Sequence, residues 1–231
     1  MKTNLKWSFC FCCLLSASGQ SGLSQPFVNL DFECANLSDY SPVTGFPTSD
    51  AIPGWTAYIG TTELTAIGYD VLTLGDPNVS VVDANFFNGS GLIQGQYSLM
   101  LQPGDNQEFQ YTSASISQTG LVPVGSESLL FDAEVGTPFT VSLGGNSLAL
   151  SVLGTSVNSA GEQITQYGAN IANYAGQTEA LTVTALAAQN STDIFDAFAF
   201  SAISVPEPDS FGLFALGALC AVLPGWRKGS Q

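Results

Sequence analysis

Alternating apolar and polar positions recur between residues 27 and 203 and predict β-strands. In the clearest case, the apolar positions from Leu129 to Val135 alternate with Asp132 and Glu134. Leu181–Ala185 and Phe198–Ser201 show the same period of two. Successive side chains of a strand point to opposite faces, so each segment predicts an antiparallel strand with one face in the core and one in water.

Eleven segments are candidate strands, and Gly, Pro, Asn and Asp separate them as turn residues do. They are Phe27–Glu33, Trp55–Ile59, Tyr69–Leu74, Val79–Asp83, Gln96–Leu101, Phe109–Gln118, Ser128–Val135, Phe139–Leu143, Ser147–Leu153, Ala180–Leu186 and Asp193–Ile203. A short turn at Ala169–Tyr174 is the one helical hint among them. Many short strands without βαβ alternation predict an all-β fold, a jelly-roll-type antiparallel β-sandwich.

The two ends of the chain lack this alternation. Residues 1–24 join Lys2 and Lys6 to the apolar run Trp7–Ala17, which is typical of a signal peptide that signal peptidase removes. Residues 210–226 are uncharged and precede the cationic pair Arg227 and Lys228. We expect a single transmembrane helix there, about 25 Å long, with the basic pair left in the cytoplasm. A buried core helix is the alternative, but the run has no polar face.

The motif before this helix resembles a bacterial sorting signal. Val205, Pro206, Glu207 and Pro208, followed by the apolar run and by Arg227 and Lys228, are similar to the PEP-CTERM family of signals. The resemblance implies that an exosortase-type membrane protease cuts at this motif. We therefore divide the chain into a signal peptide (1–24), a β-sandwich domain (25–204) and a sorting signal (205–231). The precursor is expected at the inner membrane with its domain in the periplasm, and the product at the cell surface or in the extracellular matrix.

Charge narrows the function classes. All four Lys and Arg residues lie in the terminal segments, and the chain has no His, so residues 25–204 carry 17 acidic side chains (19 minus Glu207 and Asp209) and no cation. Such a surface disfavours nucleic acid. Without His or Lys, this part of the chain cannot form a catalytic site that depends on either residue, so we expect that the protein is not an enzyme. Catalysis by a pair of carboxylates is the one mechanism that remains open to it. Cys34 is the domain's only cysteine, so no disulfide forms within it, and we expect it to be buried.

A second resemblance concerns the domain. Several short segments are similar to exported domains with the galactose-binding-like, carbohydrate-binding-module fold: Val28–Glu33, Ile52–Trp55, Tyr97–Gly104, Ser115–Thr119, Tyr167–Ile171, Ala175–Thr178 and Asp196–Ser201. In that fold the first and last strands pair, and a structural calcium often lies near them. The resemblance thus implies Asp31, Glu33, Asp193 and Asp196 as calcium ligands. The alternative is that they are solvated carboxylates at strand ends.

Sugar binding requires an aromatic side chain for the apolar face of the ring. Trp55, Tyr58, Tyr69 and Tyr111 are the candidates, and Asn85 and Asn88 lie in a predicted loop beside two phenylalanines. Trp55 as a core residue is the favoured alternative. We therefore expect an exported, non-catalytic envelope or matrix protein that binds neutral carbohydrate of the exopolysaccharide. A structural or adhesive protein without a ligand, and a carboxylate-dependent glycan hydrolase, are the alternatives.

Overall fold

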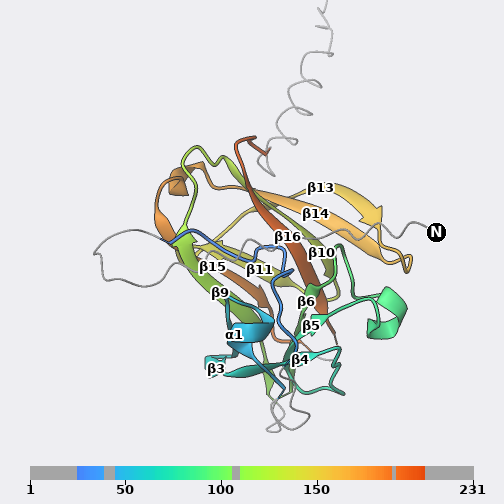
Figure 1. Cartoon of the computed structure of the whole chain (residues 1–231). Coiled ribbons are helices and arrows are strands. Elements are labelled where there is room, and N and C mark those ends of the chain that lie inside the picture. The colour runs from blue at the N-terminus through green and yellow to red at the C-terminus, as the bar shows by residue number, and fades with distance from the viewer. Residues whose placement is uncertain (1–24, 39–44, 106–109, 189–190, 206–231) are drawn as a thin grey trace, which may run out of the picture.

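Two β-sheets packed face to face form the protein in a computed structural model that describes residues 25–38, 45–105, 110–188 and 191–205 (Figure 1). The larger sheet has eight strands, in the spatial order β1 (Phe46–Pro47), β4 (Ala66–Tyr69), β5 (Asn78–Val82), β6 (Ser98–Gln102), β16 (Asp193–Ser201), β10 (Ser128–Val135), β14 (Gln163–Asn170) and β13 (Leu150–Val157). The smaller sheet has six, in the order β12 (Asn146–Ser147), β11 (Phe139–Leu143), β15 (Thr178–Ala185), β9 (Ala114–Leu121), β2 (Thr56–Ile59) and β3 (Thr62–Leu64).

The remaining elements are short. β7 (Gly104–Asp105) and β8 (Tyr111–Thr112) form a separate ribbon, α1 (Thr48–Ala51) is one turn of α-helix, and η1 (Phe86–Gly89) and η2 (Ala172–Tyr174) are 3₁₀ turns. The predicted all-β sandwich is confirmed. One pair departs from the predicted antiparallel arrangement, because β4 and β5 run parallel.

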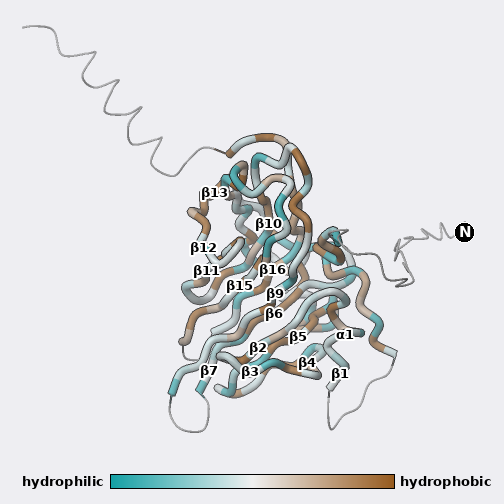
Figure 2. The backbone as a smooth tube through the Cα atoms, turned by 90° about the vertical axis from the view of Figure 1, so that its left-hand side faces the viewer, coloured by the Kyte–Doolittle hydropathy of each residue, from teal (hydrophilic) through white to brown (hydrophobic). Residues whose placement is uncertain are grey.

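The main core lies between the inner faces of the two sheets, and it follows from the alternation in the sequence. Leu129, Phe131 and Ala133 of β10 are buried in it, and the smaller sheet contributes Leu181 and Val183 of β15. The half-buried residues between them face outward. Figure 2 shows β9, β15 and β16 running through the middle of the molecule. Burial of these aliphatic and aromatic side chains, at about 25 cal/mol per Å², is the main source of stability.

β16 buries side chains on both of its faces. Between Leu130 and Asp132 of β10 the register with β16 shifts, and Ala197 adopts a φ of 56° at this bulge. Phe195 and Phe198 therefore both reach the main core. On the other face, Ile194 joins a second apolar cluster with Val82, Phe86 and Met100. The segment that follows β5 thus covers this part of the outer face of the larger sheet.

The first predicted strand is wrong. Residues 27–33 form no strand, since Asn29 and Phe32 have φ values of 51° and 54° and the chain turns there. Tertiary contacts fix this segment instead. Phe32 is fully buried in the core, and the Trp55 indole donates a hydrogen bond to the Asn29 carbonyl at 3.0 Å. The last strand, β16, pairs with β6 and β10 and not with this segment.

The predictions for the chain ends lie outside the described residues. This applies to the signal peptide and its helix (1–24), to Pro206, Glu207, Pro208, Arg227 and Lys228, and to the transmembrane segment 210–226. Within the described ranges, no helix combines the length and apolar character needed to cross a membrane. Val205, the first residue of the predicted motif, is described and is half-buried against Gly168 of β14. The domain bounds 25–204 stay a prediction.

Candidate functional site

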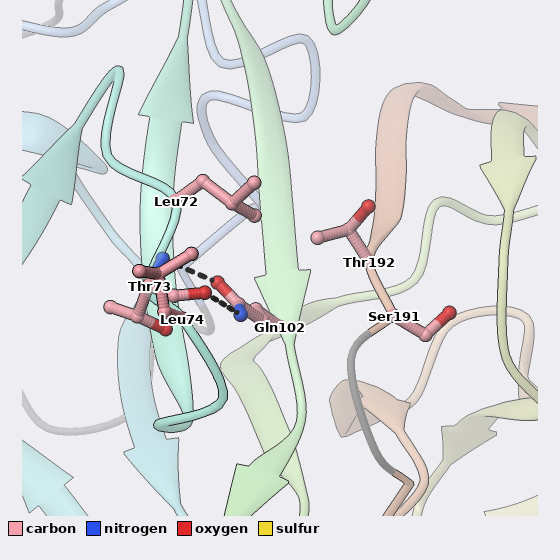
Figure 3. Close-up of a pocket in the computed structure, with 6 residues that line it drawn as sticks. All are labelled: Leu72, Thr73, Leu74, Gln102, Ser191 and Thr192. Atoms are coloured by element: carbon pink, nitrogen blue, oxygen red, sulfur yellow. Dashed lines mark hydrogen bonds between the residues drawn. The ribbon is translucent and has the colours of Figure 1, made fainter.

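A cavity of about 370 Å³ opens beside the start of β5, the end of β6 and the start of β16. Two segments that are far apart in the sequence line it, as Figure 3 shows: Leu72–Leu74 on one side and Ser191–Thr192 on the other, with Gln102 of β6 between them. None of the six lining side chains is ionisable. The volume lies within the range of small-ligand pockets, roughly 300–1,000 Å³.

Gln102 holds the first wall of this cavity. Its side-chain oxygen accepts a hydrogen bond from the Thr73 backbone N–H at 3.0 Å, and its amide donates to the Thr73 carbonyl at 2.7 Å. Asn78 adds a bond from its side-chain amide to the Val71 carbonyl at 2.9 Å. Gln102 is itself buried, so these bonds fix the Leu72–Leu74 loop to the sheet. Leu74 remains fully exposed at the rim.

Asp193 and Gly136 hold the opposite wall. The buried Asp193 carboxylate accepts hydrogen bonds from the backbone N–H groups of Gly136 and Thr137, both at 2.8 Å. A Cβ atom on Gly136 would lie 2.6 Å from the Ser191 hydroxyl oxygen and from the Thr192 carbonyl oxygen. A glycine is therefore required for Ser191 and Thr192 to pack this closely against the turn after β10.

A second group of polar side chains lies near the ends of β4 and β5 that point away from this cavity. The Tyr69 hydroxyl donates to Asp83 Oδ2 at 2.5 Å, and the Asp83 backbone N–H donates to Asp70 Oδ1 at 3.0 Å. Asn85 donates to Asp83 through its backbone and side-chain nitrogens, at 2.6 and 3.0 Å.

Burial and hydrogen bonding move the pKa values of this carboxyl pair apart. Burial, with the nearby Asp83 charge, raises the pKa of Asp70 to about 6. Burial alone would raise the pKa of Asp83 too, but hydrogen bonds from Tyr69 and Asn85 outweigh it and hold this pKa below its usual value. Burial and the bond to Asp83 raise the pKa of Tyr69. The pair therefore shares one proton over part of the acidic range.

The four predicted calcium ligands do not meet at one point. Asp31 is exposed, and Asp193 is bound to the turn after β10. Glu33 accepts hydrogen bonds from the Gln96 and Tyr97 backbones, while the buried Asp196 accepts from the Ser98 hydroxyl at 2.8 Å. Among the described residues, no three His, Cys, Asp or Glu side chains are grouped to share a metal ion. The predicted pairing of first and last strands, on which this ligand set depended, is absent. Whether the protein binds calcium at all is tested by the effect of calcium on the melting temperature.

The predicted sugar-binding aromatics are also dispersed. Trp55 is 4% exposed and packs against Phe32 and Phe198 in the core, so it is not available to a sugar, and the core alternative holds. Tyr58 is half-buried on β2, Tyr69 is held by Asp83, and Tyr111 is exposed on β8. Cys34 is half-buried, not fully buried as we expected, and it is disulfide-bonded, although residues 25–204 contain no second cysteine.

Sequence reasoning missed the cavity. Its lining consists of Leu, Thr, Ser and Gln, which are common in any sequence, and only the return of residue 191 beside residue 73 creates it. Gln102 carried the one local signal: a polar side chain at the end of a strand whose other residues, Leu99 to Leu101, are apolar. A buried amide usually requires partners, and here the partner is a loop.

No protein-family model matches the chain, and no curated protein matches it. Two solved structures are similar in outline. One is TmCBM61, solved in complex with β-1,4-galactotriose, with 15% identity, a TM-score of 0.41, and coverage of 75% of this chain and 95% of the other. The other is the enzymatically active domain of tailspike protein 4 of bacteriophage CBA120, with 11% identity, a TM-score of 0.40, and coverage of 77% of this chain and 21% of the other. Neither likeness is strong enough to assign a family or a ligand to this chain.

Proposed function

We propose that this protein is an exported, non-catalytic component of the cell envelope or extracellular matrix, and that its jelly-roll-type sandwich binds neutral carbohydrate in the cavity beside Gln102. The observation that carries the proposal is the uncharged lining of this cavity in a chain with a net charge of −15. Because the protein is acidic but the pocket has no acidic side chain, the pocket suits a neutral ligand.

The chemistry of the lining suits a hydroxyl-rich ligand. Thr73, Ser191 and Thr192 carry hydroxyls that both donate and accept hydrogen bonds, and Gln102 adds an amide. Leu72 and Leu74 supply apolar surface for the C–H groups of a sugar. Anionic polysaccharides are disfavoured, because residues 25–204 contain no Lys, Arg or His to pair with carboxylate or sulfate groups.

The geometry of Asp70 and Asp83 supports a non-catalytic role over the hydrolase alternative. Glycosidases hold their two carboxyl groups roughly 5–5.5 Å apart for retention and about 6.5–9.5 Å apart for inversion. Here Asp70 Oδ1 accepts a hydrogen bond from the Asp83 backbone N–H, and Asp83 accepts from Tyr69 and Asn85, so both carboxyl groups are engaged within the protein. Activity on extracted polysaccharide that is lost in Asp70→Asn would contradict this part of the proposal.

Binding is tested by affinity electrophoresis of the full chain in detergent, through gels that contain galactan, glucan, mannan or xylan, with alginate as the anionic control. Retardation by at least one neutral polymer and not by alginate is expected. Thr192→Val and Ser191→Ala remove hydroxyls from the cavity and should weaken retardation. Thr155→Val, on the exposed edge strand β13, is the matched control. No retardation by any polymer would favour a structural or adhesive protein without a ligand.

The export route rests on the sequence alone, through the predicted signal peptide and the similarity of Val205–Gln231 to PEP-CTERM signals. On this proposal signal peptidase and an exosortase-type protease are the processing partners. The mature C-terminus, determined by mass spectrometry from the native host, should lie near Pro206–Pro208. An intact Gln231 in the mature protein would refute this route.

A further inference from the structure

The loop between β5 and β6 presents one aromatic side chain to solvent. It begins after Val82 and includes η1, which projects from the body of the molecule as the blue-green coil in Figure 1. Phe86 and Phe87 are neighbours in it with opposite environments. Phe86 is 7% exposed and lies in the second apolar cluster, whereas Phe87 is 62% exposed. Their ring centroids are 4.7 Å apart at an interplanar angle of 78°.

The backbone at Phe87 is unfavourable for a bulky residue. Phe87 has φ 40° and ψ 45°, and Asn88 has φ 59° and ψ 36°. Both lie in the left-handed region, which asparagine tolerates and phenylalanine rarely adopts. A glycine would fit this backbone without strain. The ring of Phe87 contributes little burial to offset this cost, so its contribution to folding does not explain its presence.

Both ends of the loop are tied to the rest of the protein. Before η1, Asp83 accepts two hydrogen bonds from Asn85 and one from the Tyr69 hydroxyl of β4. After it, the side-chain amide of Asn158, from the β13–β14 turn, donates to the carbonyls of Gly89, Ser90 and Leu92 at 3.1–3.3 Å. The backbone on either side of Phe87 is therefore fixed before any ligand arrives, which lowers the entropy cost of binding.

The loop that carries Phe87 is itself uncharged and rich in amides, although the Asp83 and Glu33 carboxylates accept hydrogen bonds from residues near its two ends. Residues 84–104 contain no charged side chain, although the chain as a whole carries 19 acidic ones. Four amide residues of the loop are exposed: Asn85, Asn88, Gln94 and Gln96. An aromatic face for the C–H side of a pyranose ring, with amides for its hydroxyls, is the composition that neutral sugars require.

We infer that Phe87 and its uncharged loop form a second contact site for neutral polysaccharide, at the end of β5 opposite the Gln102 cavity. This inference rests on the proposed function and adds a residue to it. The two sites flank one strand: Asn78 at its start pairs with Gln102, and Val82 at its end leads into the loop. Four residue steps separate Asn78 from Val82 by about 13 Å along this strand, so the two sites lie beyond its opposite ends.

The test uses the same gels and the full chain. Phe87→Ala should lower the affinity for the retarding polymer about twofold to tenfold, the range expected for loss of one aromatic contact. Phe87→Tyr keeps the ring and should bind within about twofold of the unmodified protein. Val124→Ala is the matched control, because Val124 is an exposed apolar residue elsewhere on the surface and should leave binding unchanged.

A stability measurement separates a binding role from a structural one. Phe87→Gly removes the ring and relieves the left-handed backbone, so its melting temperature should equal or exceed that of the unmodified protein while its affinity falls. A lower melting temperature would identify the ring as structural and overturn the inference. Unchanged affinity in Phe87→Ala, while the unmodified protein binds, would overturn the Phe87 site alone. If the unmodified protein binds none of the neutral polymers, the proposed function fails and this site fails with it.

Discussion

Asp193 accepts hydrogen bonds from Thr137 at both its backbone N–H, at 2.8 Å, and its hydroxyl, at 2.7 Å. Asp193 is the first residue of β16, and Thr137 lies in the turn between β10 and β11, the strands of two different sheets. One buried carboxylate therefore connects the start of the last strand to the turn where the chain passes from the larger sheet to the smaller one. It also fixes the neighbouring Thr192 at the wall of the cavity.

We predict that Asp193→Ala destabilises the protein by about 3 kcal/mol. The substitution leaves the buried Thr137 hydroxyl and backbone N–H, and the part-buried Gly136 backbone N–H, without an acceptor, and each such loss is costly. Urea denaturation followed by circular dichroism measures the change. Asp76→Ala, which removes an exposed carboxylate, is the control and should lie within about 0.5 kcal/mol of the unmodified protein. Equal midpoints for the two variants would contradict the role given to Asp193.

The pH dependence of stability should run opposite to ordinary acid denaturation. Burial raises the pKa of Asp196 and of Glu134 to about 7, and that of Asp70 to about 6. The folded state thus binds more protons than the unfolded state between about pH 4 and pH 7. The stabilisation is complete below the unfolded values near 4 and is lost as the pH rises through 6 to 7. Burial also raises the pKa values of Asp132 and Asp193, so Asp83, with its lowered pKa, opposes the trend as one group against five.

Melting temperatures measured from pH 4 to pH 8 test this expectation. The melting temperature should fall as the pH rises. Asp196→Asn removes one of the carboxyl groups whose pKa is raised, so it should make the melting temperature depend less on pH. Asp76→Asn should leave this dependence unchanged. A melting temperature that rises throughout this interval would contradict the expectation.

Strands whose two faces differ were predictable from the sequence. Ser128–Val135 and Phe139–Leu143 have the predicted bounds, because their burial alternates as their hydropathy does. β14 was missed. It lies between β10 and β13, but it contributes small or polar residues such as Gly168 and Ala169, so its sequence lacks the usual apolar period. Hydrogen bonds from β10 and β13 hold it as a strand, although its side chains do not predict one.

The N-terminal segment was mispredicted because its strand-like sequence serves tertiary contacts. Phe32 enters the core, and the Leu30 carbonyl accepts a hydrogen bond from the Phe198 N–H at 3.0 Å, where a single contact replaces a ladder. The candidate site was predicted less accurately than the fold. The pocket is lined by residues that are far apart in the sequence, so no local pattern predicts it. The aromatic residues that we expected to bind sugar are equally suited to the core.

Trp55 illustrates that ambiguity and gives the third prediction. Trp55→Ala should cost about 3–5 kcal/mol, because it opens a cavity beside Phe32 and Phe198. Tyr111→Ala, at an exposed position on β8, should change stability by less than about 0.5 kcal/mol. Urea midpoints compare the two. If Trp55→Ala stays as stable as the unmodified protein and loses polysaccharide binding, Trp55 belongs to a binding site after all.

The fourth prediction concerns Asn158, which connects the β13–β14 turn to the loop that carries Phe87. Its side-chain oxygen accepts hydrogen bonds from the backbone N–H groups of Ala160 and Glu162, at 3.0 and 2.9 Å, while its amide donates to the loop. Asn158→Ala should therefore loosen both segments. A loss of about 1–2 kcal/mol in global stability is expected, since the three hydrogen bonds from its amide are only part-buried.

The local effect should exceed the global one. Hydrogen exchange followed by mass spectrometry should show faster exchange at residues 89–94 in Asn158→Ala, with the strands of the core unchanged. Asn173→Ala, at an exposed position in η2, is the matched control. If preorganisation of the loop matters for sugar binding, Asn158→Ala must also weaken retardation in the polysaccharide gels, although Asn158 itself does not contact the ligand. Faster exchange without any loss of affinity would mean that Phe87 adapts to its ligand, and that the tethers serve the fold alone.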